Sequence, residues 1–472
     1  MNRRNFAKQA VMASGGFLLA NKFTYAAGAA FPEVRVPEAQ RKFRSTAVEA
    51  AIKKVQSTIG NKELAWLFGN SFPNTLDTTV EFELKDGKPD TYVITGDIDA
   101  MWLRDSTAQV WPYLPLMKED KKLQQLIQGV ISRQATCILK DPYANAFYKN
   151  ESQISEWKDD VTDMKPGIHE RKWEIDSLCY PVRLGYHYWK QTGDTSVFTS
   201  QWKEAALLIL KTFREQQRKD GHSPYKFERK TAWATDSVPL GGYGYPAKPV
   251  GLICSMFRPS DDATIFPYLI PSNFFAVVSL QQLAEIFKTV LKDTANAVEF
   301  TKLADEVQKA VNEYAVVTHP KFGKVYAYEV NGYGSFNLMD DANVPSLLSL
   351  PYLGAIKNTD PIYINTRKLL FSEENPFFFK GKAGEGIGGP HVGVNMIWPL
   401  SIIMRGLTSD NDAEIKMCLE TLQKTHGGTG FIHESFHKDD PTKFTRKWFA
   451  WANTIFGEFV WKVFREKPQL LS

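Results

Sequence analysis

Hydrophobic residues recur along most of the chain with the spacing of an amphipathic helix. The first such run starts at Ser45, where Ala47, Ala50, Ala51 and Val55 begin a period of about 3.6 residues. Later runs come in consecutive pairs along the sequence. These predicted helices cover residues 106–117 and 121–139, 178–191 and 198–218, 272–287 and 294–316, 344–353 and 361–371, 393–405 and 411–424, and 449–464.

A short passage near the N-terminus has the pattern of β-strands instead. Residues 79–84 and 92–95 read as strands, and the turn Lys85-Asp86-Gly87-Lys88-Pro89 separates them. The sequence therefore predicts a small β-like insertion in a chain that is otherwise helical.

Segments rich in polar and aromatic residues precede the first helix of each pair. Because this arrangement recurs, we expect six such loops to meet on one face, with the second helix of each pair lying outside the first. That layout is an all-α (α/α)6 toroid with six inner helices, six outer helices and a cleft at one end, formed by residues 31–472 as a single catalytic domain. The segments share no sequence identity, so the inference is architectural. They are residues 96–106, 172–177, 258–262, 337–343, 388–392 and 431–436.

The first thirty residues resemble a bacterial export signal. Arg3 and Arg4 precede a modest apolar run over residues 11–20, and small residues follow at 26–30. This is typical of a twin-arginine signal cleaved near Ala29 or Ala30, which predicts an exported, periplasmic protein. An ordinary N-terminal helix is the alternative. No later stretch reaches eighteen apolar residues, so we expect no membrane association once the signal is removed.

Charge and cysteine content exclude several classes of partner. The formal charge of +4 comes from Arg3, Arg4, Lys8 and Lys22, so the remaining 442 residues are neutral (+4 − 4 = 0). A neutral chain without a basic tract argues against nucleic acid or an anionic membrane as partner. The four cysteines are too far apart for a CxxC site, and buried thiols are expected, with a disulfide left open. They are Cys137, Cys179, Cys254 and Cys418.

The segment Gly96–Ser106 is the richest in chemistry. It combines three carboxylates with Arg104 and Trp102 within about ten residues. Such a set suits a pocket that binds the hydroxyls of a sugar with carboxylates and arginine, and its apolar face with tryptophan. Aromatic residues make up 13% of the chain, which fits either a carbohydrate cleft or a large aromatic core. A capped helix N-terminus with an Arg–Asp pair is the structural alternative.

Two further patterns point away from phosphate and metal chemistry. Residues 241–245 are glycine-rich but lack the Gly-Lys-Ser/Thr of a phosphate loop. The letters His433-Glu434-Ser435-Phe436-His437 spell HExxH, which binds zinc when both histidines lie on one helical face. Here glycines precede the motif and Lys-Asp-Asp-Pro follows it, so a loop is expected and zinc is the lesser alternative.

Paired carboxylates remain as candidates for catalysis. A glycosidase needs one protonated acid beside the leaving oxygen and one ionised carboxylate, which activates water or attacks carbon. In the pairs Asp261-Asp262 and Asp340-Asp341, one acid can raise the pKa of its neighbour. A helix N-cap is the structural alternative for either pair.

Four motifs together resemble glycoside hydrolase family 125: residues 96–106, Trp173–Ser177, Phe257–Asp262 and His433–Phe436. The resemblance covers nearly the whole chain after residue 30, in order. It implies an (α/α)6 exo-α-1,6-mannosidase that inverts configuration without metal or other cofactor. It also implies Asp261 as the general acid, with Asp262 as the alternative, and Glu434 as the general base.

The resemblance implies an α-mannoside oligosaccharide as the binding partner. Carboxylates and arginines would bind its hydroxyls and tryptophans would stack on its rings, while some of these residues orient the others. Another inverting exo-glycosidase of the same fold, such as a glucosidase, and a non-catalytic glycan-binding protein remain the alternatives. The predicted binding residues are Asp99, Trp102, Arg104, Asp105, Glu174, Asp176, Arg258, Asp262, Asp340, His391, Trp398 and Trp451.

Overall fold

The computed structural model describes residues 31–472, so the predicted export signal lies outside the described residues. Helices build most of this part, and the strands form only small sheets of two or three. The helices are α2 (Thr46–Thr58), α3 (Lys62–Ser71), α4 (Asn74–Thr78), α5 (Leu103–Val110), α6 (Lys121–Lys140), α7 (Ile175–Thr192), α8 (Ser200–Gln216), α9 (Ile270–Thr289), α10 (Thr294–Tyr314), α11 (Pro361–Leu370), α12 (Pro399–Leu407), α13 (Asp412–Lys424) and α14 (Ala450–Glu466).

The strands mostly pair with near neighbours in antiparallel fashion. β1 and β2 form the hairpin that the sequence predicted, with Val80 opposite Val93 and the left-handed residues Asp86 and Gly87 at its turn. Three-stranded sheets have the orders β3-β4-β5, β10-β9-β6 and β13-β14-β15. The strands are β1 (Val80–Lys85), β2 (Lys88–Val93), β3 (Met101–Trp102), β4 (Ala146–Phe147), β5 (Ile168–Glu170), β6 (Tyr268–Leu269), β7 (Val316–His319), β8 (Gly323–Tyr326), β9 (Glu329–Val330), β10 (Phe336–Asn337), β11 (Phe378–Lys380), β12 (Glu385–Ile387), β13 (Met396–Ile397), β14 (Ser435–His437) and β15 (Asp440–Thr445).

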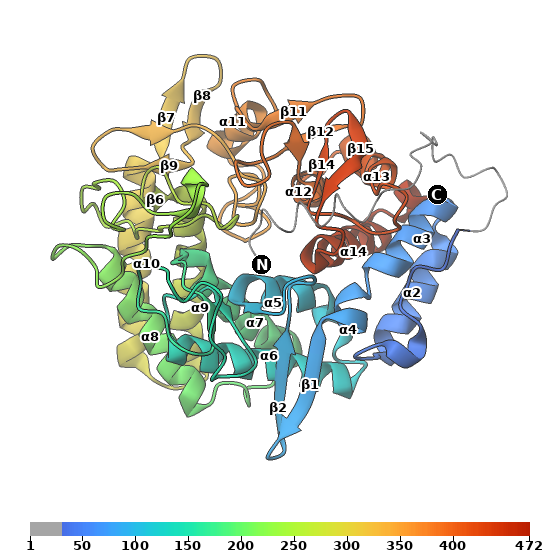
Figure 1. Ribbon diagram of the computed structural model, residues 1–472, viewed down its shortest axis with the longest axis horizontal. Helices are drawn as coiled ribbons and strands as arrows, with labels where there is room; N and C mark the ends of the chain where they lie inside the picture. The colour runs from blue at the N-terminus through green and yellow to red at the C-terminus, as the bar shows by residue number, and fades with distance from the viewer. Residues whose placement is uncertain (1–30) are drawn as a thin grey trace.

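The helices are arranged around the centre of the molecule (Figure 1). An inner series runs from α9 through α7, α5 and α14 to α12, each helix packing on the next. Every residue of α5 is buried, because this helix is covered on all sides. The helices α6, α8, α10 and α13 lie outside, and α10 buries only an apolar stripe that faces α9. The fold is therefore a helical toroid whose inner helices form its core.

One predicted inner helix is absent from the described chain. Residues 344–353 form turns and bends, so the prediction of a helix there is wrong. Both carboxylate oxygens of Asp340 accept backbone N–H groups, from Leu347 at 2.9 Å and Leu348 at 3.0 Å. The hydroxyls of Ser346 and Ser349 also bond to each other's backbone. Such local bonds compete with helical hydrogen bonding, and they decide the conformation of this segment.

Two smaller differences arise near the N-terminus. The helix predicted over 106–117 is α5 followed by a 3₁₀ helix, Trp111–Leu116, because Pro112 and Pro115 cannot continue an α-helix. The sequence pattern also missed α3 and α4. Both helices pack against α14, so they close the ring between the early and late parts of the chain.

The outer and inner helices begin differently. Each outer helix starts with a residue whose side chain accepts a backbone N–H of the first turn. The inner helices start with residues that make no such bond, and neighbouring loops accept their first N–H groups instead, as the Asn145 carbonyl does for α5 and the Ser255 hydroxyl does for α7. The capping residues are Ser45, Asp120, Thr199, Asp293, Asp360 and Asn411. The uncapped positions are Trp102, Glu174, Leu269, Trp398 and Phe449.

Two further findings concern membranes and redox chemistry. Among residues 31–472, the helices are all too short or too polar to cross a membrane. All four cysteines are buried free thiols, as expected for residues that serve as small apolar groups.

Candidate active site

The six polar segments predicted to meet on one face are joined by direct contacts. Arg104 in segment 96–106 contacts acids in segments 172–177 and 258–262. The Ser260 hydroxyl donates to Asp341 at 2.6 Å, and His391 Nδ1 lies 3.5 Å from an oxygen of Asp262. Arg446 joins segment 431–436 back to segment 96–106. The loops that precede the inner helices therefore form one continuous site.

Arg104 is the centre of the acidic side of this site. Its Nη1 donates to Glu174 at 2.6 Å and to Asp176 at 2.9 Å, and its Nη2 donates to Asp261 at 3.2 Å. The side chains of Glu174 and Asp176 are fully buried. Burial raises the pKa of Glu174 well above its usual value, although Arg104 opposes the shift. Three carboxyl groups thus share one cation, which favours a bound proton among them.

The side chains of Asp261 and Asp262 differ in how much of their surface is exposed to solvent. The side chain of Asp261 is 21% exposed, whereas that of Asp262 is 2% exposed. Burial raises the pKa of Asp262, but His391, Thr235 and Arg258 together outweigh burial and lower that pKa. Asp261 has a φ of +66°, a left-handed conformation that costs a residue other than glycine some strain. Asp261 is therefore the carboxyl group of the pair that an incoming substrate can reach.

Glu434 lies on the other side of the site, directly before β14. Its Oε1 accepts a hydrogen bond from Arg446 Nη1 at 3.5 Å. Arg446 also donates through Nε to Asp97 at 2.9 Å, and its guanidinium lies 4.6 Å from the centre of the Phe449 ring. The side chain of Glu434 is 7% exposed. Sequence reasoning counted Asp97 among the carboxylates of segment 96–106 but missed Arg446, although a cation a few residues before an inner helix was a signal.

Asp105 lies between the two sides. Burial raises its pKa to about 6, while Arg104 lowers it, Asp261 raises it and Arg446 lowers it. These interactions place the carboxyl of Asp105 within electrostatic reach of both the Asp261 side and the Arg446 side. Asp105 therefore couples the two sides of the site electrostatically.

One asparagine pins each of the two loops that carry Asp261 and Glu434. The Asn273 side chain on α9 accepts from Ile253 N–H at 2.8 Å and donates to the Ile253 carbonyl at 3.0 Å. It also donates to the carbonyl of the residue before α9, so it closes the loop between these points. Asn453 on α14 makes the same three bonds around the Glu434 loop, with Ile432 at its root. Both asparagines are the fourth residue of their helix.

Arg258 and Asp340 bond to the protein itself. Arg258 is buried and donates to Glu329 at 2.7 Å. The other oxygen of Glu329 accepts the backbone N–H groups of Ile265 and Phe266 at 3.2 and 3.3 Å, so Arg258 braces the loop that carries Asp261. Asp340 orders the turn at 344–353 as described above. The structure thus gives both residues a role in shaping the loops.

The tryptophans predicted to bind sugar lie in different parts of the molecule. Trp102 packs edge-on against His169, with ring centres 5.1 Å apart. Trp398 lies 6.2 Å from His391, and both are near the Asp262 side of the site. Asp99 is exposed in the loop between β2 and β3. Trp451 is buried at the start of α14 and faces a cavity on the toroid axis.

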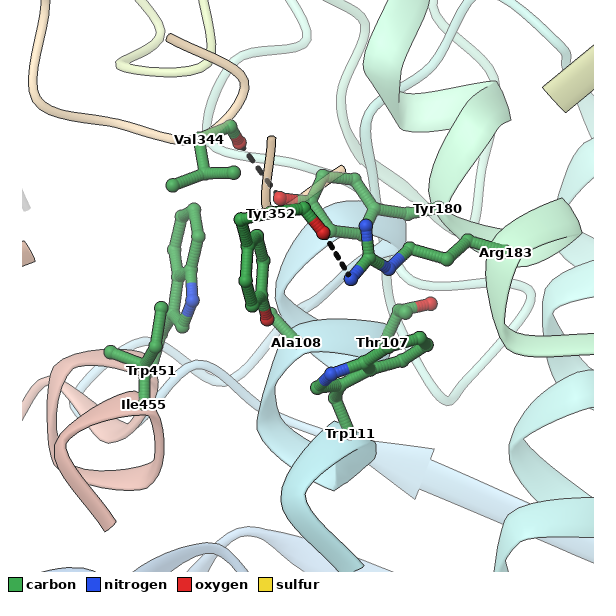
Figure 2. Close-up of a pocket in the computed structure, with 9 residues that line it drawn as sticks. All are labelled: Thr107, Ala108, Trp111, Tyr180, Arg183, Val344, Tyr352, Trp451 and Ile455. Atoms are coloured by element: carbon green, nitrogen blue, oxygen red, sulfur yellow. Dashed lines mark hydrogen bonds between the residues drawn. The ribbon is translucent and has the colours of Figure 1, made fainter. Parts of the chain in front are cut away.

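That cavity is lined by residues of α5, α7 and α14 and of segment 344–353 (Figure 2). It has a volume of about 10 Å³, room for no more than a water molecule. Arg183 lies between the rings of Trp111 and Tyr352, at 4.0 and 4.7 Å. Glu458 accepts hydrogen bonds from the Trp111 N–H and the Tyr352 hydroxyl. These side chains therefore fill the space between α7, α14 and segment 344–353.

The HExxH letters do not form a zinc-binding helix. Ser435–His437 is strand β14, and His433 stacks on Phe444 with ring centres 3.7 Å apart. The motif therefore lacks the helix on which HExxH binds zinc, and Nε2 of His433 already bonds to the Thr429 hydroxyl and the His426 carbonyl. Within residues 31–472, no group of three or more histidine, cysteine or acidic side chains is placed to hold a metal ion.

Comparison with known proteins identifies the family. Residues 61–461 match the profile described as metal-independent alpha-mannosidase (GH125). The chain belongs to glycoside hydrolase family 125. The family resemblance inferred from the motifs is therefore confirmed, and with it the assignment to a family of α-mannosidases.

Relatives of this GH125 chain agree along nearly its whole length. It is 44% identical over 452 residues to the Meiotically up-regulated gene 157 protein of Schizosaccharomyces pombe, covering 91% of this chain and 88% of that one. A Streptococcus pneumoniae metal-independent α-mannosidase, solved in a non-productive complex with α-1,6-mannobiose, is 42% identical with a TM-score of 0.87. That match covers 90% of this chain and 100% of the other. A GH78 rhamnosidase of Bacillus sp. GL1 shares the fold alone, at 11% identity and a TM-score of 0.53 over 86% of this chain and 35% of that one.

Proposed function

We propose that this protein is an exo-acting, inverting α-1,6-mannosidase that removes mannose from the non-reducing end of α-mannosides. The observation that carries the proposal is the pair Asp261 and Glu434. These carboxylates stand on separate loops at one end of the toroid, each bonded to its own arginine. The bound α-1,6-mannobiose of the Streptococcus pneumoniae relative supports this linkage as the first to test.

In the proposed reaction Asp261 is the general acid. Its carboxyl proton passes to the glycosidic oxygen as the bond between that oxygen and the anomeric carbon breaks. Glu434 takes a proton from a water molecule, whose oxygen bonds to the anomeric carbon from the opposite face. The products are β-mannose and the shortened glycan. An inverting enzyme needs the two carboxyls ~6.5–9.5 Å apart, which separate loops can provide.

The packing of side chains between the inner helices supports exo action. A glycan chain cannot thread through the toroid, because Arg183, Trp111 and Tyr352 fill its axis. Only the end of a chain can then reach Asp261. Arg104 and Asp105, with Trp102 and Trp398, are the proposed contacts for the hydroxyls and the ring of the terminal mannose, while the fully buried Glu174 and Asp176 orient Arg104.

Two finer points of architecture and location are also proposals. We infer that residues 344–353 take the place of the sixth inner helix, so that the toroid keeps a six-plus-six plan. We also propose export to the periplasm through the twin-arginine signal in residues 1–30. Replacing Arg3 and Arg4 by lysine should hold the precursor in the cytoplasm, and unchanged export in a fractionation assay would contradict the signal.

The decisive experiment for function is hydrolysis of α-1,6-mannobiose beside its α-1,2 and α-1,3 isomers. We expect release of mannose from the α-1,6 isomer, with β-mannose as the first anomer seen by proton NMR. Formation of α-mannose first would exclude inversion. Hydrolysis of α-glucosides in preference would favour a glucosidase, and tight binding without product would favour a glycan-binding protein.

A further inference from the structure

A second cluster of buried charges lies directly behind Asp261. It contains the cations Lys172 and Arg229 and three acids. Arg229 donates to Asp160 at 2.6 Å and to Glu170 at 2.9 Å, and it lies 3.8 Å from the centre of the Trp157 ring. Such a cluster is costly to bury, so its members must be well paired to be stable.

Lys172 is the member of this cluster that reaches the site. Its ammonium donates to Asp236 at 2.7 Å and to the backbone carbonyl of Asp261 at 2.9 Å, and it lies 3.3 Å from a Glu170 oxygen. A protonated lysine has three N–H donors, so each has one acceptor. The side chain is 0% exposed, which fixes it in this position. Burial lowers the pKa of Lys172, but Glu170 and Asp236 outweigh it and keep the group charged.

The bond from Lys172 acts on a strained piece of backbone. Asp261 has its φ at +66°, and its own N–H donates to the Arg258 carbonyl at 2.9 Å. Two residues later, the Ala263 N–H donates to the Thr235 carbonyl at 2.7 Å, next to Asp236. The backbone of Asp261 is thus held by buried groups of the protein itself. Its orientation decides where the carboxyl group points.

We propose that Lys172 is a positioning residue for proton donation by Asp261. By holding the Asp261 carbonyl, the Lys172–Asp236 pair fixes the carboxyl in line with the leaving oxygen of the substrate. This rests on the proposed function, in which Asp261 is the general acid. Lys172 touches neither the substrate nor the reacting atoms. Its effect is confined to the step that needs a proton.

Two substrates separate this role from a merely structural one. Hydrolysis of α-1,6-mannobiose needs a proton on the departing sugar oxygen, whereas 2,4-dinitrophenyl α-mannoside releases a phenolate that needs none. The ratio of the two turnover rates, measured on one preparation, does not depend on the fraction of folded enzyme. Asp261→Asn should lower this mannobiose-to-aryl ratio by about 10²–10⁴-fold.

Lys172→Met should lower the same ratio by at least about 10-fold, because a small displacement of a catalytic group has large effects on rate. Arg229→Met is the matched control, since it removes an equally buried cation of the same cluster that does not bond to Asp261. It should lower the melting temperature while keeping the ratio within about 2-fold of the wild type. If Lys172→Met gives no folded protein, Lys172→Gln replaces it, with the same expected direction.

The outcomes separate the two proposals. An unchanged ratio in Lys172→Met, or an equal fall in Arg229→Met, would overturn the positioning role while the mannosidase stands. An unchanged ratio in Asp261→Asn would instead show that the general acid is misassigned. Failure of the wild-type enzyme to cleave either substrate would remove the proposed function itself.

Discussion

At the scale of single residues, the proposed role of each acid follows from how exposed its carboxyl group is. Asp261 and Glu434 keep part of their carboxyl groups accessible, while Glu174 and Asp176, the other acids that accept from Arg104, are fully buried. Buried acids bonded to an arginine can bind or orient substrate, but a group that gives a proton to a glycosidic oxygen must touch it. Residues on the two sides of the site should therefore respond to mutation differently.

Removal of either proposed catalytic carboxyl should stop turnover and spare the fold. We expect Asp261→Asn and Glu434→Gln each to lower kcat on α-1,6-mannobiose by about 10²–10⁴-fold. Steady-state kinetics with circular dichroism of each variant checks this. Asp99→Ala is the control, since Asp99 is exposed and should act mainly on KM. An Asp99→Ala variant as inactive as Glu434→Gln would contradict the division.

Arg104 should be important for stability as well as for activity. Arg104→Met leaves Glu174 and Asp176 buried without their cation, which we expect to cost about 3–5 kcal/mol at neutral pH. The loss should be smaller at pH 5, because both acids can then be protonated. Urea unfolding at the two pH values measures it. Arg214→Met, which breaks an exposed pair with Glu299, should cost less than about 1 kcal/mol at either pH.

At the scale of elements, the inner and outer helices of the toroid differ in how their first turns are hydrogen-bonded. Outer helices use side-chain caps, whereas the first N–H groups of α5, α7, α9 and α14 bond to neighbouring loops. On α9 and α14 the first turn contributes an asparagine that pins the loop before the helix. The geometry of the site thus depends on these two side chains more than on the length of the loops.

Asn453→Ala should reduce both stability and activity. It leaves the N–H and carbonyl of Ile432 unpaired in a buried place, at about 1–3 kcal/mol for each. Because Ile432 is two residues from Glu434, kcat should fall as well. The matched control is Asn411→Ala at the exposed start of α13, which should cost about 1 kcal/mol and leave kcat unchanged. Equal kcat in both variants would contradict the role of Asn453.

Sequence pattern anticipated the paired helices, because amphipathic faces follow from the period of apolar residues alone. It failed at residues 344–353, where Asp340, Ser346 and Ser349 bond to the backbone. The same pattern could not pair Arg104 with Glu174 and Asp261, which lie 70 and 157 positions away. Lys172 and Arg446 were overlooked for the same reason, since a cation in a single sequence does not reveal its partners.

At the scale of the molecule, the ring is closed in two ways. α3 and α4 join its ends by packing on α14, and a cluster on the axis closes its centre. Glu458 holds this cluster together through Trp111 and Tyr352. Burial raises the pKa of Glu458 to about 7, although its hydrogen bonds and Arg183 oppose the shift.

The stability of the toroid should therefore depend on pH through Glu458. Its folded pKa lies above the unfolded value, so the folded state loses stability as pH rises from about 4.5 to about 7, by up to about 3 kcal/mol. Glu458→Gln should be less sensitive across this range, since an amide bonds to both partners without charge. Thermal unfolding from pH 5 to 8 measures the difference. Glu420→Gln, on the exposed face of α13, should behave like the wild type.

The hydrogen bonds of Asn273 and Asn453 set the loops before α9 and α14 apart as separate units of the toroid. Asn273 and Asn453 hold the two ends of their loops together at the base, so changes between those ends need not reach the helices behind them. Loops of different length or composition can then be exchanged on an unchanged ring. Enzyme engineers seeking a new sugar specificity should vary other residues between the bonded ends of these loops, and keep both asparagines and the catalytic carboxyls of Asp261 and Glu434.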